Sequence, residues 1–338
     1  MEEDRSIFPP DVRDRTTFLK WHSYMRNLLL ENQEYMMMFD YKAEQRTLKI
    51  GGVRIGGTPG RIPTVLIPSI FYTKDRVVKN ADTGDFDKKA TETILNILTE
   101  LTEKTGLGTM LDVVATTTES IEKYLQYLAD NTEFPLLIDG SDSLEVNTSG
   151  IKFAEEAGFI DRVIINSLTP ETKDELFKAV EEYGLKNALI LTFNSASMIS
   201  SSKRVEQADA LIQRGQTKGI TNILIDTGVM DLPTLGIACK TQYILKSKYG
   251  FPVGNGAHNA ISTWKGLVPK FGKEAKKPAL VGSSLMPIAL GADFVLMGPA
   301  RNAQLVYPSV AMIDVALSGI LIEDGIRPDK PHPRYLVS

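Results

Sequence analysis

Residues 136–166, LLIDGSDSLEVNTSGIKFAEEAGFIDRVIIN, hold two short apolar runs that are separated by a helical segment. The first run, Leu136-Leu-Ile-Asp139, ends on a carboxylate, and the second, Val163-Ile-Ile-Asn166, ends on a carboxamide. Parallel strands that are buried on both faces read as continuous apolar runs. This stretch therefore predicts a strand–helix–strand unit of a parallel sheet, with a polar side chain where each strand ends.

The same pattern recurs along the rest of the chain. The other runs span residues 65–69, 110–112, 189–194, 223–226, 253–259 and 294–299, and a helical segment follows each run. Eight strands in unbroken alternation with helices favour an α/β fold closed into a (β/α)8 TIM barrel. An open, doubly wound sheet is the alternative.

Six of the eight runs stop on a carboxylate or a carboxamide. These residues are Asp112, Asp139, Asn166, Asn194, Asp226 and Asn259. Ends of parallel strands lie at the rim where α/β proteins place their chemistry. Three Asp and three Asn, without a lysine or cysteine, indicate a neutral heterocycle with many hydrogen-bonding edges.

Asp139 and Asp226 suit such a ring because an amino-pyrimidinone offers adjacent N–H and NH₂ donors to the two oxygens of a carboxylate. The Asn amides donate and accept at once. Gly256, in the stretch Gly254-Asn-Gly-Ala-His-Asn259, lets a ligand approach the backbone. The alternative for each Asp is a helix cap or a loop brace, and for each Asn a turn.

Other kinds of catalysis find little support in the sequence. His258 is a candidate general acid, with a structural role as the alternative, and His22 and His332 lie in terminal segments, so no metal triad is expected. A single cysteine, Cys239, excludes an internal disulfide and a multi-cysteine metal site. Without a strand-end lysine or a nucleophile elbow, we expect a cofactor to supply the reactivity.

Composition and charge are ordinary for a globular protein. The chain has 338 residues, a net charge of −4 and an isoelectric point near 5.6. No basic stripe stands out, so nucleic acid is not an expected partner. No uncharged stretch of membrane-spanning length and no secretory pattern are apparent, so we predict a cytoplasmic protein.

We divide the chain into residues 1–38, an N-terminal extension, and residues 39–338, a single barrel. The extension is either a flexible lead with a loose amphipathic helix over Phe18–Met38, or the result of a start codon that truly lies at Met36, Met37 or Met38. Leu48-Lys-Ile-Gly-Gly-Val-Arg-Ile55 predicts a hairpin that closes the bottom of the barrel, with a phosphate loop as the alternative.

Helix boundaries carry clear signals. Asp87 is expected to cap a helix that ends before Gly106, and Thr169 to cap one with Pro170 at its first position. The long basic loop at residues 264–277 is either a solvated face or a site for an anionic tail or a docking protein. The role of Arg301, just past the last predicted strand, is open in the same way.

Several segments together resemble a known family: Ile50-Gly-Gly-Val-Arg-Ile-Gly-Gly57, Ser69-Ile-Phe-Tyr72, Met110-Leu-Asp-Val-Val114, Ile138-Asp139, Ile165-Asn-Ser167, Ile225-Asp226 and Gly256-Ala-His-Asn-Ala260. From Phe39 onward the chain resembles the H subunit of tetrahydromethanopterin S-methyltransferase and the methylcorrinoid:tetrahydrofolate methyltransferases. These belong to the pterin-binding barrel superfamily.

The resemblance implies that Asp139, Asn166 and Asp226 hold a pterin ring and that Asn259 bonds near its N5. Relatives often carry Asp-Ser-Thr where this chain has Asp139-Gly-Ser141, so a hydroxyl contact from position 140 is not expected. The implied reaction moves a methyl group between N5 of tetrahydrofolate and the cobalt of methylcobalamin or a protein-bound corrinoid, in the direction of methyltetrahydrofolate. The corrinoid would be carried on a separate protein, and the chain would form a homodimer without a bound metal.

Three alternatives stay open. The reaction could run the reverse way, from methyl-tetrahydromethanopterin or methyl-tetrahydrofolate to a corrinoid protein. The chain could be a non-catalytic pterin-binding subunit. It could also be another barrel enzyme, such as a pterin synthase or a lyase acting on a phosphorylated ligand, which predicts phosphate binding around Gly282-Ser-Ser284 and the turn after the eighth strand.

Overall fold

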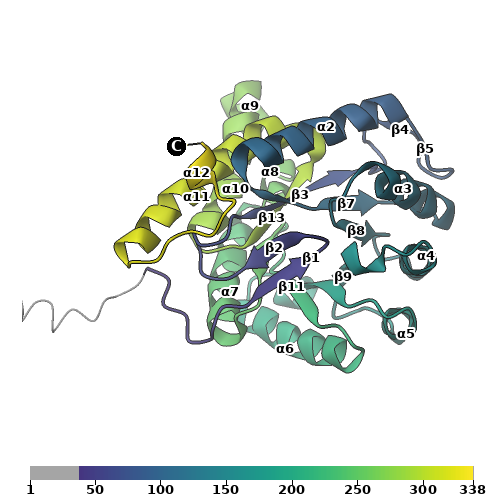
Figure 1. The fold of residues 1–338 in the computed structure, drawn as a ribbon, viewed down its shortest axis with the longest axis horizontal. Coiled ribbons are helices and arrows are strands. Elements are labelled where there is room, and N and C mark those ends of the chain that lie inside the picture. The colour runs from purple at the N-terminus through teal and green to yellow at the C-terminus, as the bar shows by residue number, and fades with distance from the viewer. Residues whose placement is uncertain (1–37, 338) are drawn as a thin grey trace, which may run out of the picture. The chain divides into compact units, whose positions relative to one another are not determined.

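The computed structural model describes residues 38–337, and residues 41–337 belong to one compact unit. Within it, eight parallel strands form the barrel (Figure 1). They are β3 (Val65–Ile70), β7 (Leu111–Val114), β8 (Leu136–Asp139), β9 (Val163–Leu168), β10 (Asn187–Leu191), β11 (Asn222–Asp226), β12 (Val253–Asn255) and β13 (Phe294–Pro299). Each strand pairs with the next, and β13 pairs back with β3, where Val295 lies opposite Leu66. The prediction of a closed (β/α)8 barrel is confirmed.

Helices cover the outside of the barrel. The longer ones are α2 (Lys88–Thr105), α3 (Thr118–Asn131), α4 (Leu144–Glu156), α5 (Asp174–Glu182), α6 (Ser201–Thr217), α7 (Leu232–Tyr249), α10 (Lys276–Ala289) and α11 (Ala303–Glu323). Helices α3, α4 and α5 follow one another along one side in Figure 1. The short helices α8 (His258–Ser262), α9 (Leu267–Phe271) and α12 (Pro333–Leu336) complete the set in the described chain, together with β6 (Gly108–Thr109), which extends the sheet beside β3, and a small hairpin, β4 (Val78–Asn80) and β5 (Asp85–Phe86).

A second hairpin closes the N-terminal end of the barrel. Strands β1 (Thr47–Ile50) and β2 (Val53–Gly56) pair antiparallel around Gly51 and Gly52, which both have positive φ. Ile50 and Ile55 are fully buried and pack with the inward-facing apolar side chains of the barrel strands. The hairpin is thus part of the core, as predicted, and the opposite end of the barrel is left for the strand termini that carry polar groups.

Helix signals in the sequence are partly confirmed. Asp87 caps α2 by accepting the Ala90 N–H at 3.0 Å, and Gly106 follows its end at φ 71°. The prediction for Thr169 is wrong. The Thr169 N–H donates to the Thr172 hydroxyl at 2.7 Å, so a tight turn forms there and the helix begins at Asp174.

Helix α11 is long and apolar enough, by length and composition, to cross a membrane: an 18-residue window within residues 300–323 has a mean hydropathy of 1.9. The expectation that the chain has no stretch of membrane-spanning length is wrong for these residues. In the structure α11 packs against α2 and α10, and its Asp314 accepts hydrogen bonds from the backbone and hydroxyl of Thr64, both at 2.7 Å. Much of its apolar surface therefore covers the barrel, as in the core helix of a globular domain.

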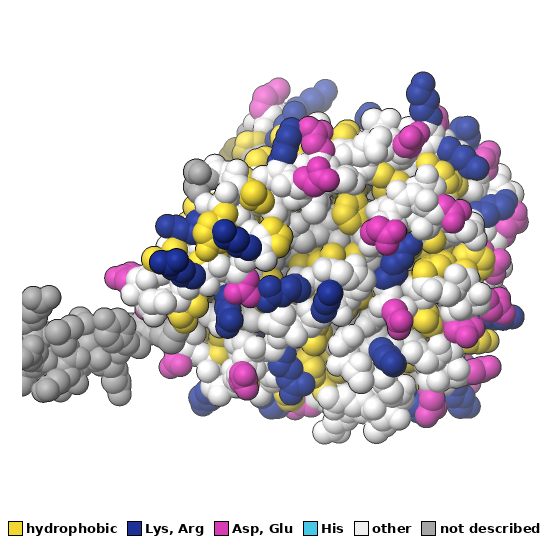
Figure 2. Space-filling model, in the orientation of Figure 1, with side chains coloured by type: hydrophobic (Ala, Val, Ile, Leu, Met, Phe, Trp, Pro, Cys, Tyr) yellow, Lys and Arg dark blue, Asp and Glu magenta, His cyan; other side chains and the backbone are white. Residues whose placement is uncertain are grey.

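The prediction of a helix at Phe18–Met38 and of an alternative start codon concerns residues that, apart from Met38, lie outside the described range. The division at residue 38 stays a prediction. On the face drawn in Figure 2, acidic and basic side chains alternate without a stripe of one sign. This agrees with the absence of a basic stripe in the sequence.

Candidate functional site

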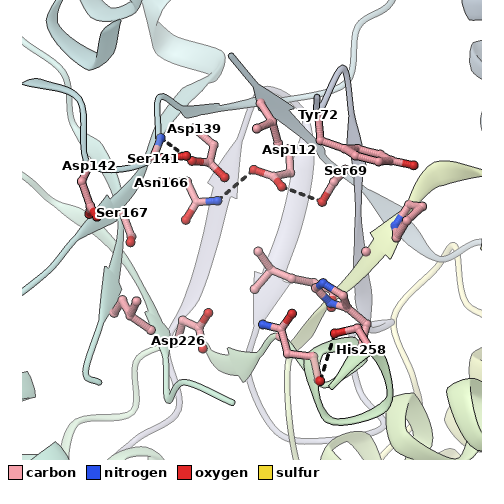
Figure 3. A pocket seen from close by; sticks show the side chains of 18 of the residues that line it. Ser69, Tyr72, Asp112, Asp139, Ser141, Asp142, Asn166, Ser167, Asp226 and His258 are labelled. Carbon is pink, nitrogen blue, oxygen red and sulfur yellow. Dashed lines mark hydrogen bonds between the residues drawn. The ribbon is translucent and has the colours of Figure 1, made fainter. Parts of the chain in front are cut away.

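A pocket of about 530 Å³ opens at the C-terminal ends of the barrel strands (Figure 3). Its lining residues come from the ends of β3, β7, β8, β9, β10, β11 and β13 and from α8 and the loops beside them. It includes Asp112, Asp139, Asp142 and Asp226, and none of the described residues in the lining is a lysine or arginine. An anionic ligand would therefore be repelled, whereas a neutral ring rich in N–H donors would find several acceptors.

One wall is a chain of hydrogen bonds built on the strands themselves. Ser69 in β3 lies beside Asp112 in β7, and its hydroxyl donates to Asp112 Oδ2 at 2.6 Å. Asn166 in β9 donates through Nδ2 to Asp112 Oδ1 at 2.8 Å. Burial raises the pKa of Asp112, and these two hydrogen bonds act against that rise. With Nδ2 occupied, Asn166 keeps Oδ1 as an acceptor for a ligand.

Asp139 ends β8 on the same wall. Its Oδ1 accepts the N–H of Ser141 at 2.8 Å, in a turn where Ser141 has φ 52°. Burial, followed by the nearby Asp112 carboxylate, raises the pKa of Asp139 to about 7. The group is thus half-neutral near physiological pH and becomes fully ionised when a ligand offers donors to it.

Asp226 ends β11 and lies across the pocket from Asp112 and Asn166 (Figure 3). Its Oδ1 accepts the Gly228 N–H at 2.7 Å. Burial raises the pKa of Asp226 to about 6, although the Gly228 N–H and the positive charge of Arg204 act in the opposite direction. At neutral pH a carboxyl with this pKa is mostly ionised, so Asp226 is a second carboxylate that can accept from a ring donor.

Arg204 in α6 is fully buried and holds the loop that carries Asp226. Its guanidinium donates to the carbonyls of Thr227 and Gly228 at 2.7 and 2.8 Å, and also to Ser197 and Met198 in the loop after β10. Burial lowers its pKa to about 10, so it stays cationic at neutral pH. Arg204 positions Asp226 without lining the pocket.

Asn259 lines the pocket with a side-chain amide that hydrogen-bonds no other described residue. Only its backbone is engaged: its N–H donates to Gly256 and its carbonyl accepts from Ser262 and Thr263. Gly256 leaves room beside the amide, since a Cβ there would approach Asn259 Nδ2 to 3.3 Å. Asn259 therefore offers both a donor and an acceptor to a ligand.

His258 is held by the backbone of β13. Its Nδ1 lies 2.9 Å from the Leu296 carbonyl, which only accepts, so the proton is on Nδ1 and Nε2 carries the lone pair. Burial lowers the pKa of His258 below its usual value. The side chain is thus a neutral acceptor, and a role as a general acid finds no support.

The structure brings together six of the seven predicted site residues. Asp112, Asp139, Asn166, Asp226, Gly256 and Asn259 line the pocket. Asn194 does not: β10 ends at Leu191, and Asn194 accepts the N–H groups of Ala196 and Ser197 in a turn while its Nδ2 donates to Glu171. The turn alternative therefore applies to Asn194, and Leu191 lines the pocket in its place.

Several pocket residues had no singular signal in the sequence. Ser69, Tyr72, Ser141, Ser167 and Thr169 line it, although Ser69, Tyr72 and Ser167 lie in segments on which the resemblance rested. Arg204 could not have been found, because an arginine in an amphipathic helix reads as exposed. The phosphate site expected for another barrel enzyme is not formed at Ser283 and Ser284, which are buried in α10 with both hydroxyls donating to the Leu280 carbonyl.

The sequence matches, over residues 43–329, the model of the family described as tetrahydromethanopterin S-methyltransferase MtrH subunit. The chain belongs to the MtrH family. It is 35% identical to the H subunit of tetrahydromethanopterin S-methyltransferase from Methanothermobacter thermautotrophicus over 308 residues, which cover 88% of this chain and 99% of that protein. The H subunit from Methanopyrus kandleri is 34% identical over 322 residues, covering 89% of this chain and all of the relative.

This MtrH-family chain shares its fold with dihydropteroate synthases. The Yersinia pestis enzyme with a pterine–sulfa conjugate matches with a TM-score of 0.57 at 13% identity, over 80% of this chain and 99% of that one. The Xanthomonas albilineans enzyme in complex with 7,8-dihydropteroate gives a TM-score of 0.51 at 16% identity, over 80% and 98%. These likenesses show a shared barrel fold. Membership of a family of methyltransferase subunits supports a methyltransferase role.

Proposed function

We propose that the protein transfers a methyl group between a corrinoid cobalt and N5 of tetrahydrofolate, in the direction of methyltetrahydrofolate. The observation that carries this proposal is the amide of Asn259, which no described residue engages, in a pocket of partly neutral carboxyls. The names of the relatives, which specify a pterin methyltransferase subunit, point to the same substrate class.

The fit of a reduced pterin follows from its donors and acceptors. The ring presents N–H and NH₂ groups along one edge, which match the carboxyls of Asp139 and Asp226. Its acceptors are met by the Asn259 amide, while Asn166 Oδ1 adds a further acceptor for ring N–H groups. Asp139 and Asp226 each already accept a backbone N–H through Oδ1, whereas no described residue engages the Asn259 amide.

The protein's part in the reaction is to hold the pterin and to hydrogen-bond N5 both when N5 carries a proton and when it does not. The corrinoid substrate supplies the methyl group: N5 uses its lone pair to form the N–CH₃ bond, and the electrons of the cobalt–carbon bond stay on cobalt. Asn259 accepts from N5–H before transfer, and the proton leaves to solvent. In the reverse direction its Nδ2 donates to methylated N5. An amide serves both states, so no strong acid is required.

The partners remain expectations that accompany this proposal. The corrinoid would reach the pocket on a separate protein that docks on the C-terminal end of the barrel, where Ile199 and Met230 are exposed on the loops after β10 and β11. We also expect a homodimer and a cytoplasmic location. A non-catalytic pterin-binding subunit is the competing function, since the same pocket would serve it.

The test is an anoxic mixture of the purified protein with methylcobalamin and either tetrahydrofolate or tetrahydromethanopterin, followed by the corrinoid spectrum. The proposal expects demethylation that requires protein and tetrahydrofolate. Tetrahydrofolate binding without turnover, even with a corrinoid-carrying protein from the same host, would favour the binding subunit. Turnover with tetrahydromethanopterin alone would overturn the choice of pterin.

A further inference from the structure

A second pocket, of about 500 Å³, adjoins the first one. The two pockets share His258, Ser262 and Pro299 in their linings, so α8 and the end of β13 form a common wall. The second pocket lies beside the basic segment 264–277. The prediction of a long loop there is wrong, because the segment contains α9 and the start of α10. Its remaining lining comes from α9, α10, the turn after β13 and the start of α11.

The two pockets carry opposite charge. Four cationic side chains line the second one: Lys265, Lys276, Lys277 and Arg301. None of its described lining residues is acidic, whereas the first pocket has four aspartates. None of the three lysines forms an ion pair with a described residue. Within the described chain their charges are thus uncompensated, and we name this the basic pocket.

Apolar surface lies between these charges. Leu267, Val268, Leu280 and Leu305 line the basic pocket together with Trp264, whose ring packs edge-on against Phe271 at 5.9 Å. The indole N–H of Trp264 donates to no described residue. A planar spacer next to an anionic end would match this combination of an aromatic wall and cations.

Arg301 links the two pockets directly. Its guanidinium donates to the hydroxyl of Tyr72, which lines the first pocket, and lies 5.8 Å from the Tyr72 ring centroid. Arg301 forms no ion pair with a described carboxylate. We call the first pocket, the proposed site of the pterin ring, the ring pocket. A ligand that extends from it past the shared wall would therefore meet hydrogen-bond donors for an anion.

We propose that the basic pocket binds the anionic tail of the pterin substrate, with carboxylate or phosphate groups on Lys276, Lys277 and Arg301 and the aryl spacer along Trp264. This inference rests on the proposed function for the ring pocket. It assigns the specificity for long-tailed coenzymes to a separate site, because a ring pocket lined by aspartates would repel the tail. The basic segment then has a role in substrate binding.

The test separates ring and tail with three ligands: 6-methyltetrahydropterin, which has the ring alone, p-aminobenzoylglutamate, which has the tail alone, and tetrahydrofolate. Each dissociation constant is measured for the wild type, for the double variant Lys276→Gln/Lys277→Gln, and for Lys270→Gln. Lys270 is exposed in α9, within the same basic segment, but does not line the basic pocket, so Lys270→Gln is the matched control for the loss of a charge.

We expect the double variant to bind tetrahydrofolate roughly 10-fold more weakly and with a smaller salt dependence, since two of the four cationic side chains of the basic pocket are removed. Binding of the tail alone should fall likewise, and binding of 6-methyltetrahydropterin and the behaviour of Lys270→Gln should stay unchanged. An equal loss of affinity for 6-methyltetrahydropterin would overturn the assignment. So would an unchanged affinity for tetrahydrofolate together with weaker binding of methylcobalamin. Failure of the wild type to bind 6-methyltetrahydropterin while it binds the tail would instead refute the proposed function and leave the anion site standing.

Discussion

Asn166 Nδ2 donates to Asp112 Oδ1 at 2.8 Å, and this bond fixes which end of the amide a ligand meets. Asn166 has Nδ2 turned to Asp112 and its carbonyl oxygen not engaged by a described residue, whereas no described residue engages either end of the Asn259 amide. The two Asn residues therefore differ in role: Asn166 is a fixed acceptor, and Asn259 adapts to the protonation state of its partner.

Replacing Asn166 by Asp places a second carboxyl against Asp112. Two carboxyls at hydrogen-bond distance share a proton, so the variant should bind tetrahydrofolate less tightly as the pH rises from 6 to 8. Titration calorimetry over this range measures the effect. Binding by Asn166→Asp that is as tight at pH 8 as at pH 6 would contradict the role of the Asp112–Asn166 bond.

Asn259→Ala should lower the rate of methyl transfer by about 100-fold with little change in the dissociation constant of the pterin, because the lost hydrogen bond acts at N5 as its charge changes. Asn194→Ala is the matched control. It removes a turn cap at a cost of about 1 kcal/mol in stability and should leave the rate unchanged. Single-turnover kinetics with methylcobalamin compare the two variants.

Ring binding should be linked to proton release. The pKa of Asp139 is raised to about 7, so part of the population is neutral at pH 6.5, and a ring donor needs the carboxylate. The affinity for tetrahydrofolate should therefore increase as the pH rises through 7 and level off above about pH 8. Calorimetry at pH 6.5 in two buffers of different ionisation enthalpy should detect the released protons, and Asp139→Asn should abolish the release.

Asp226 should oppose folding at alkaline pH. Its pKa is raised from 3.8 to about 6, so the folded state holds the proton more tightly than the unfolded state does. The stability that this proton contributes is complete below pH 4 and is lost as the pH rises through 6. Asp226→Asn should consequently be more stable to unfolding than the wild type at pH 8, by roughly 2 kcal/mol. The gap should close near pH 4, and a gap that is equal at both values would refute the linkage.

Arg204→Lys should destabilise the barrel by about 3 kcal/mol, because one ammonium group replaces a fork that serves four buried carbonyls. Unfolding by denaturant measures this loss of stability. Arg214→Lys is the comparison: Arg214 pairs with the exposed Asp174, and its loss should cost less than about 1 kcal/mol. Similar losses for both variants would mean that Arg204 does not organise the loops around Asp226.

The barrel could be predicted because strands that are buried on both faces appear in the sequence as continuous apolar runs. β8 and β13 span the residues that the apolar runs at 136–139 and 294–299 indicated. The hairpin at Leu48–Ile55 could also be predicted, because apolar and polar side chains alternate around Gly51 and Gly52. Both glycines have positive φ in the structure. These are local patterns that tertiary contacts only reinforce.

The site was predicted less completely, because side-chain direction depends on where each strand stops. Asn194 lies beyond the end of β10, where its side-chain oxygen caps a turn, and Asn259 lies beyond β12 in the first turn of α8. Both look the same in the sequence, yet the first amide is consumed by local hydrogen bonds and the second is engaged by no described residue. The turn at Thr169–Thr172 and the burial of Arg204 likewise depend on hydrogen bonds that no sequence pattern indicates.

A crystal structure of the protein with methyltetrahydrofolate tests the central claim most directly. We predict the pterin ring in the pocket of Figure 3, with its N–H edge on the carboxylates of Asp139 and Asp226 and N5 within about 3.2 Å of the Asn259 amide. A pterin bound elsewhere, or a ring whose N5 faces away from Asn259 beyond hydrogen-bond reach, would contradict it.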